Sequence, residues 1–69
     1  MYTQAQELKK GQIVQAAAVV FAGKGYGRAT IAEIAEEAEV GKGTVFEYFE
    51  SKEDLFFEVF RFCIEAHKQ

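Results

Sequence analysis

The sequence predicts an all-α fold, a small helical bundle within a single domain, from three observations. The 69 residues include no proline. β-branched residues form no alternating runs, whereas apolar residues recur at spacings of three and four, which is the helical pattern. Hydrophobic residues make up 49% of the chain, so a core can form, but a chain of this length supports only one small domain.

A first helix is expected from about residue 4 to about residue 22. Gly11 weakens this helix by about 1 kcal/mol relative to alanine, so we expect it to fray or to begin there. Gly23 and Gly25 supply the left-handed conformation that ends a helix. The apolar face of this helix carries Ile13, Ala16, Ala17, Val20 and Phe21.

A second, shorter helix is expected from residue 31 to residue 38. Thr30 and Glu33 have the spacing of a capping box, in which each side chain reaches the backbone N–H of the other residue. The turn that follows spans residues 39–41, and Val40 is expected to plug the corner between two helices. Gly41 can act as the N-cap of the next helix.

A third helix is expected from residue 42 to residue 49. Its inner face should hold Val45, Phe49 and part of Phe46, which leaves Gly43, Thr44, Glu47 and Tyr48 pointing outward. Two short helices joined by a three-residue turn form a helix-turn-helix, whose second helix is built to enter the major groove of DNA.

A fourth helix is expected from residue 52 to about residue 68, opened by a second capping box between Ser51 and Asp54. Its apolar arc covers roughly 220°, against the roughly 100° that one packing surface requires. The side chains left without a neighbour are expected to form a dimer or interdomain interface. They are Phe56, Phe57, Phe60 and Ile64.

Together these segments resemble the N-terminal DNA-binding domain of the tetracycline-repressor (TetR) family of bacterial transcription regulators. The resemblance runs from Ile13 to about Val59 and rests on I-V-Q-A-A-A-V-V-F, the G-Y ahead of Thr30, I-A-E-I-A, V-G-K-G-T-V-F-E-Y-F and S-K-E-D-L. It implies a three-helix homeodomain-like core plus the start of a fourth helix. It also implies a larger C-terminal domain that dimerises and senses a small molecule, and residues 1–69 are expected to be the DNA-binding domain without it.

The resemblance also implies which residues contact DNA. The Thr30 hydroxyl and the Lys52 ammonium would meet phosphates. Alternatively, Lys42 and Lys52 are solvated lysines, and the Tyr48 ring covers the edge of the core. Glu47 either accepts a hydrogen bond from a cytosine amine or is a solvated glutamate. The expected DNA-binding set is Thr30, Lys42, Gly43, Thr44, Phe46, Glu47, Tyr48 and Lys52.

The charge of this segment opposes the predicted partner. The whole chain carries a net charge of −3, and residues 28–52 hold three cations (Arg28, Lys42, Lys52) against six anions (Glu33, Glu36, Glu37, Glu39, Glu47, Glu50). Neutralised phosphates supply most of the non-specific affinity for DNA, so that affinity should be low. The chain also departs from the family pattern at Glu39, where glycine is usual, at Gly41, where serine is usual, and at Phe46, where tyrosine is frequent.

Other classes of function find little support, so neither an enzyme nor a cofactor or metal site is expected. No serine–histidine–acid set is present, and G-K-G-T at residues 41–44 lacks the upstream glycine of a phosphate loop. Cys63 and His67 share a helix face without further ligands, so we interpret them as a core cysteine and an exposed histidine. The apolar stretch after Lys9 and Lys10 is a poor secretory signal, and a cytoplasmic protein without membrane contact is expected.

Two functional hypotheses follow from the sequence. In the first, the domain belongs to a homodimeric repressor that reads a pseudo-palindromic operator through residues 42–49, with a small-molecule effector acting through the C-terminal domain. In the second, the chain is an association module that dimerises through the aromatic face of the fourth helix, with weak or no DNA binding.

Overall fold

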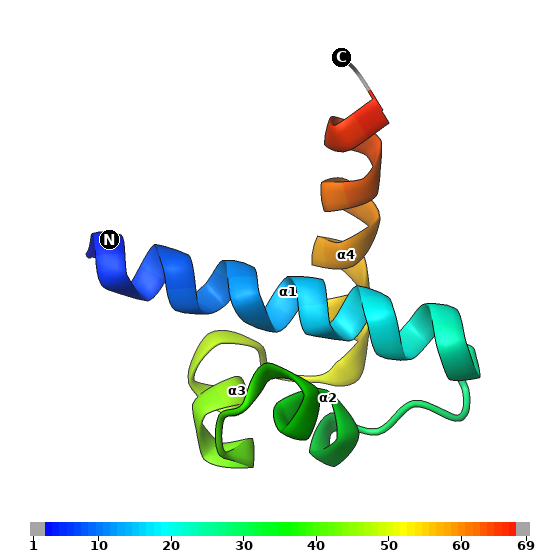
Figure 1. Cartoon of the computed structure of the whole chain (residues 1–69), viewed down its shortest axis with the longest axis horizontal. Helices are drawn as coiled ribbons and strands as arrows, with labels where there is room; N and C mark the ends of the chain where they lie inside the picture. The colour runs from blue at the N-terminus through cyan, green and yellow to red at the C-terminus, as the bar shows by residue number, and fades with distance from the viewer. Residues whose placement is uncertain (1–2, 68–69) are drawn as a thin grey trace.

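The chain folds around one long helix, as a computed structural model that describes residues 3–67 shows. Within these residues it has four helices, α1 (Gln4–Lys24), α2 (Ile31–Ala38), α3 (Lys42–Tyr48) and α4 (Lys52–His67). α1 crosses the middle of the molecule, α2 and α3 lie on one side of it, and α4 projects away on the other side (Figure 1). The all-α prediction is confirmed.

The hydrophobic core lies where the helices meet. Every helix contributes at least one side chain with no exposed surface, and these five are Ile13, Ala17, Ile34, Val45 and Leu55. Burying a large aliphatic side chain stabilises a fold by about 1.5–3 kcal/mol. The same cluster includes Phe49 just after α3 and Val59 on α4, so the core fixes α3 and the first half of α4 relative to α1.

α1 is longer and better capped than the sequence predicted. Thr3 caps it through a capping box with Gln6, which the sequence analysis missed. The helix runs unbroken through Gly11, so the predicted fraying or start at that glycine is wrong. Gly23 lies inside the helix, and the chain turns only at Gly25, whose φ of 85° suits a residue without a Cβ. Packing of the apolar face outweighs the weak helix propensity of glycine.

α2 and the turn after it follow the prediction closely. The Thr30–Glu33 capping box is present, and the helix ends at Ala38. Glu39 then takes the left-handed conformation, with φ 61° and ψ 41°. The N–H of Glu39 donates to the carbonyl of Glu36 (3.1 Å) and that of Val40 to the carbonyl of Ala35 (2.9 Å), which is a Schellman motif. Val40 packs against the core, as predicted.

α3 ends one residue before its predicted end, and α4 starts where predicted. α3 ends at Tyr48, and Phe49 is its C-cap in an extended conformation. α4 is described to His67, and its predicted end at residue 68 lies outside the described residues. The Ser51 hydroxyl accepts from the N–H of Asp54 (3.2 Å), but the Asp54 carboxylate accepts from the N–H of Glu50 (3.3 Å) and not from Ser51. Half of the second capping box is therefore formed as predicted, while the Asp54 carboxylate binds the N–H of Glu50, one residue before Ser51.

Candidate nucleic-acid interface

α3 is held by its inner face and presents a mixed outer face. Val45 and Phe49 are buried in the core and orient the helix. Lys42, Gly43, Phe46 and Glu47 are exposed, and Thr44 and Tyr48 are half-buried. Because Gly41 and Gly43 carry no side chain, the backbone at the start of α3 is accessible to a ligand surface.

Tyr48 and Phe46 lie between the inner and the outer face of α3. Tyr48 was expected to point outward, but it is half-buried and packs against the core, with its ring centroid 6.5 Å from that of Phe49. Phe46 was expected to lie partly on the inner face, and 46% of it is exposed, which fits that position. Its exposed part adds an apolar surface to the outer face of α3.

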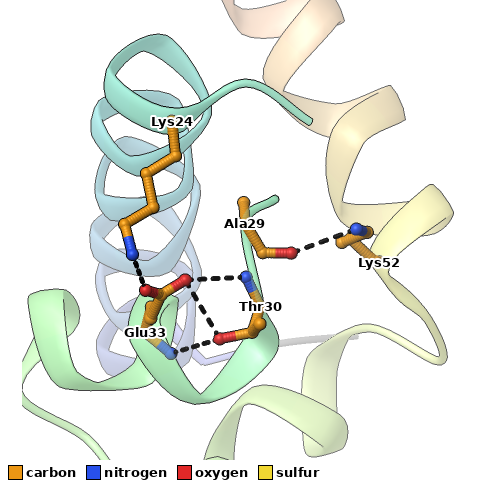
Figure 2. A network of polar contacts seen from close by, with 5 residues as sticks. All are labelled: Lys24, Ala29, Thr30, Glu33 and Lys52. Atoms are coloured by element: carbon orange, nitrogen blue, oxygen red, sulfur yellow. Dashed lines mark hydrogen bonds and ion pairs between the residues drawn. The ribbon is translucent and has the colours of Figure 1, made fainter. Parts of the chain in front are cut away.

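Thr30 stands at the start of α2 inside a network of polar contacts (Figure 2). Its hydroxyl accepts from the backbone N–H of Glu33 (3.1 Å) and lies 3.1 Å from the Glu33 carboxylate, which also accepts from the Thr30 N–H (3.1 Å). Lys24 at the end of α1 forms an ion pair with the same carboxylate. Because a hydroxyl has a single proton to donate, Thr30 can donate to a phosphate only after releasing Glu33.

The pKa of the Glu33 carboxyl lies below its ordinary value. The hydrogen bond from Lys24 is the main cause, and the bonds from Thr30 add to it, whereas partial desolvation acts in the opposite direction. Glu33 is therefore ionised at neutral pH, and its charge is locally compensated by Lys24. The positive charge of Lys24 thus offsets one of the six negative charges counted in residues 28–52. The sequence did not indicate this contribution from α1.

Lys52 begins α4 and reaches back to the α1–α2 connection at residues 25–30. Its ammonium donates to the backbone carbonyls of Tyr26 (2.8 Å) and Ala29 (3.0 Å) and lies 4.4 Å from the centroid of the Tyr26 ring. The predicted phosphate contact of Lys52 stays a prediction, and the structure adds two internal acceptors that the sequence did not indicate.

The other five acidic side chains of residues 28–52 lie in two places. Glu36, Glu37 and Glu39 are exposed near the end of α2, whereas Glu47 and Glu50 are exposed on and just after α3. The second group lies on the element that would approach DNA. Like charges there oppose binding to a polyanion most strongly at low salt, where screening is weak.

The outer face of α4 is apolar and largely uncovered. Phe57 is 60% exposed, Phe60 54% and Ile64 46%. Phe56 is 43% exposed as well, although its ring also packs edge-on against Tyr26 at 5.0 Å and Phe21 at 5.7 Å between centroids. It therefore has aromatic neighbours that the sequence did not indicate, and its place in an interface stays a prediction.

Three other features of the described residues bear on earlier expectations. Cys63 is exposed on α4, so its interpretation as a core residue is wrong, and the side chain of His67 lies outside the described residues. Within the described part of the chain, no group of three or more His, Cys, Asp or Glu side chains is arranged to hold a metal ion. Nor does any helix described here have the length and apolar character to cross a membrane.

Comparison with known proteins decides the family. Residues 13–59 match the family described as bacterial regulatory proteins, tetR family. The chain belongs to the TetR family. The predicted resemblance, the helix-turn-helix fold and DNA-binding transcriptional regulation as the function of the family are confirmed.

Relatives of this TetR-family chain are themselves transcriptional regulators. It is 35% identical over 63 residues to the HTH-type transcriptional regulator HbdR of Aromatoleum sp. (strain CIB), covering 91% of this chain and 28% of that protein. It is 49% identical over 51 residues to the HTH-type transcriptional regulator LuxR of Vibrio harveyi, covering 74% of this chain and 25% of that protein. It is 40% identical over 50 residues to the fatty acid metabolism regulator protein of Bacillus subtilis (strain 168), covering 72% of this chain and 26% of that protein.

A solved structure agrees with this assignment. The crystal structure of HlyIIR, a hemolysin II transcriptional regulator, matches with a TM-score of 0.78 and 39% identity over 81% of this chain and 31% of that one. The TetR-family chain described here thus spans about a third or less of the length of the proteins it matches.

Proposed function

We propose that this TetR-family chain binds duplex DNA by placing the outer face of α3 in the major groove, and that it serves a repressor that reads a pseudo-palindromic operator as a homodimer. The observation that carries the proposal is the anchoring of α3. Val45 and Phe49 are buried in the core, while Lys42, Gly43 and Glu47 stand exposed beside them. A rigidly held helix with an exposed polar face is the geometry that groove insertion requires.

The proposed contacts divide by chemistry. Lys42 supplies a cation for a phosphate, and Gly43 lets the backbone approach closely. Thr44 offers a small hydroxyl donor, Glu47 can accept from a cytosine amine, and Phe46 supplies apolar contact such as a thymine methyl group accepts. Tyr48 and Thr30 stand at the edge of this face, each already engaged within the protein. Binding by a single copy is expected to be weak and to fall steeply with salt.

Repression would follow from occupation of the operator, and release would come from an effector bound elsewhere in a longer protein. The matched relatives are at least three times as long as the aligned part, which leaves room in them for such a domain. The chain is not expected to be an enzyme, because the regulators it resembles are named for transcription and not for catalysis. A cytoplasmic location, where DNA is accessible in bacteria, belongs to the same proposal.

The proposal is tested by mapping the DNA-binding surface on the uniformly ¹⁵N-labelled chain by NMR. A short duplex of random sequence is titrated at low salt, and amide shifts are followed residue by residue. The expected result is that the largest shifts fall on residues 42–48 and at Thr30, while amides of residues 57–64 stay in place. Shifts centred on α4, or none on α3, would remove α3 from the interface.

A second candidate function is supported by the exposed face of α4. Phe57, Phe60 and Ile64 form an apolar surface that a second copy could cover, and monomeric proteins rarely leave such a patch open. The test is sedimentation of the chain at several concentrations, together with a Phe60→Glu variant. A dimer that Phe60→Glu dissociates would support association through α4, and a monomer at all concentrations would exclude it. A helix-4 dimer would be compatible with DNA binding through α3.

A further inference from the structure

Side chains bind both the carbonyl and the N–H of the peptide unit between Ala29 and Thr30 (Figure 2). Its carbonyl oxygen accepts from the Lys52 ammonium at 3.0 Å. Its N–H donates to the Glu33 carboxylate at 3.1 Å, and that carboxylate is itself paired with Lys24. Side chains from the end of α1, the first turn of α2 and the start of α4 therefore fix one peptide plane.

This peptide plane sets the start of the helix-turn-helix. Thr30 follows the carbonyl that Lys52 holds, and its hydroxyl caps α2. Ala29 is 2% exposed, so its carbonyl has little access to water in place of Lys52. Rotation of the plane would move the Thr30 hydroxyl and the first N–H groups of α2 together, which are the groups nearest the proposed phosphate contacts.

The environment of Lys52 suits a permanent internal role. The ammonium is half-buried and has three donors, of which two serve the carbonyls of Tyr26 and Ala29. The Tyr26 ring lies beneath it at 4.4 Å from the centroid, an attractive cation–π geometry. A swing of the side chain toward a phosphate would leave both carbonyls without this donor, and unmade hydrogen bonds at poorly hydrated sites are costly.

We propose that Lys52 is a positioning residue for DNA binding: it holds the Ala29–Thr30 peptide and thereby orients Thr30 and α2, in place of acting as a phosphate ligand. The inference rests on the proposed function of α3 for its effect on DNA. Its structural half, the control of the peptide plane, stands independently of DNA. Lys42 is the natural contrast, because it is also the first residue of its helix but is exposed and makes no hydrogen bond to the other described residues.

The test compares Lys52→Met with the matched variant Lys42→Met, since both remove one cation and keep the side-chain length. Amide hydrogen exchange of Thr30 and Glu33 is measured without DNA, and the Phe49 amide, which donates to Val45 (3.0 Å), serves as an internal reference. Lys52→Met should speed exchange at Thr30 and Glu33 roughly tenfold more than at Phe49, because a charge-assisted bond is lost at that peptide. Lys42→Met should leave all three amides unchanged.

The DNA arm uses the salt dependence of binding to a random duplex. A lost phosphate contact lowers the slope of log K against log salt by about 0.9. Lys42→Met should show this loss, whereas Lys52→Met should bind more weakly with the slope of the unchanged chain. Lys52→Arg, which keeps the charge and N–H donors, should recover most of the Thr30 and Glu33 protection and of the affinity.

The outcomes separate the two proposals. A slope reduced by Lys52→Met as much as by Lys42→Met, with Thr30 exchange unchanged, would make Lys52 a phosphate ligand and overturn the inference. No DNA binding by any form would defeat the proposed function, while faster Thr30 exchange would still support control of the peptide plane. Should Lys52→Met fail to fold, Lys52→Gln replaces it in both arms, and unchanged exchange at Thr30 in that variant would equally overturn the inference.

Discussion

The rings of Tyr26 and Phe56 meet edge to face with their centroids 5.0 Å apart, and this contact joins the α1–α2 connection to α4. Phe21 of α1 completes the cluster, with its ring 5.4 Å from Tyr26 and 5.7 Å from Phe56. The Lys52 ammonium also lies over the Tyr26 ring. The start of α4 is therefore held by both apolar and polar contacts. The connection at residues 25–30 is thus a packed part of the structure.

The aromatic cluster predicts unequal effects for two neighbouring phenylalanines. Phe56→Ala should destabilise the chain by about 1–2 kcal/mol, since it removes a ring that is 43% exposed but has two aromatic neighbours. Phe57→Ala, the control, removes a ring that is 60% exposed and should change stability by no more than about 0.5 kcal/mol in a monomer. Urea unfolding followed by circular dichroism measures both, and equal losses would mean that the cluster contributes nothing specific.

The left-handed backbone at Glu39 predicts that glycine at this position increases stability. Its φ of 61° places a residue with a Cβ in the left-handed region, where glycine is unstrained. Glu39→Gly should therefore stabilise the chain by about 0.5–1 kcal/mol, after allowing for the greater freedom of glycine in the unfolded state. Glu39→Ala removes the same charge but keeps the Cβ, so it separates strain from electrostatics. Thermal unfolding in which Glu39→Ala gains as much as Glu39→Gly would argue against strain.

The Glu33 network predicts a loss of stability in acid. The folded-state pKa of Glu33 lies below its ordinary value of 4.5. Its contribution to the free energy of unfolding is therefore fully present above that ordinary value and is lost as the pH falls through the lowered one. Glu33→Gln can keep the capping box but cannot titrate. The stability difference between the unchanged chain and Glu33→Gln should shrink between neutral pH and pH about 3, and a constant difference would contradict the assigned ion pair.

Removal of the Glu47 charge is expected to raise the non-specific affinity for DNA. Its carboxylate is exposed on α3, so Glu47→Gln removes a like charge from the surface that approaches phosphates. Affinity for a random duplex at low salt should rise by roughly twofold to fivefold, as loss of one screened repulsion implies. Glu37→Gln is the matched control, because Glu37 lines a groove toward α1. An equal gain from both variants would indicate a general effect of net charge, and no gain from Glu47→Gln would place Glu47 away from the duplex.

Local features of the fold were predictable from the sequence because local chemistry determines them. The capping box of Thr30 and Glu33 depends on residues three apart, and the apolar spacing placed α2 at its observed bounds. The start of α1 was predicted, but its behaviour at Gly11 was not, because the packing of a long helix against α2 and α4 outweighs one residue's propensity.

Long-range contacts of the site could not be predicted, because they join residues that are far apart in the sequence. Lys52 bonds to carbonyls 26 and 23 residues away, and no spacing rule connects such positions. The pairing of Phe56 with Tyr26 likewise depends on how α4 crosses the α1–α2 connection. Tyr48 was assigned to the outer face by a helical projection, but it lies at the last residue of α3 and packs against the core.

DNA binding through α3 is tested by a fluorescence-anisotropy titration of a labelled random duplex with the 69-residue chain at low and at moderate salt. Weak binding at low salt that falls steeply as salt rises is expected, with a slope that corresponds to a few released counterions. Absence of binding even at low salt would contradict it, because the acidic side chains around α3 would then outweigh the groove-facing helix.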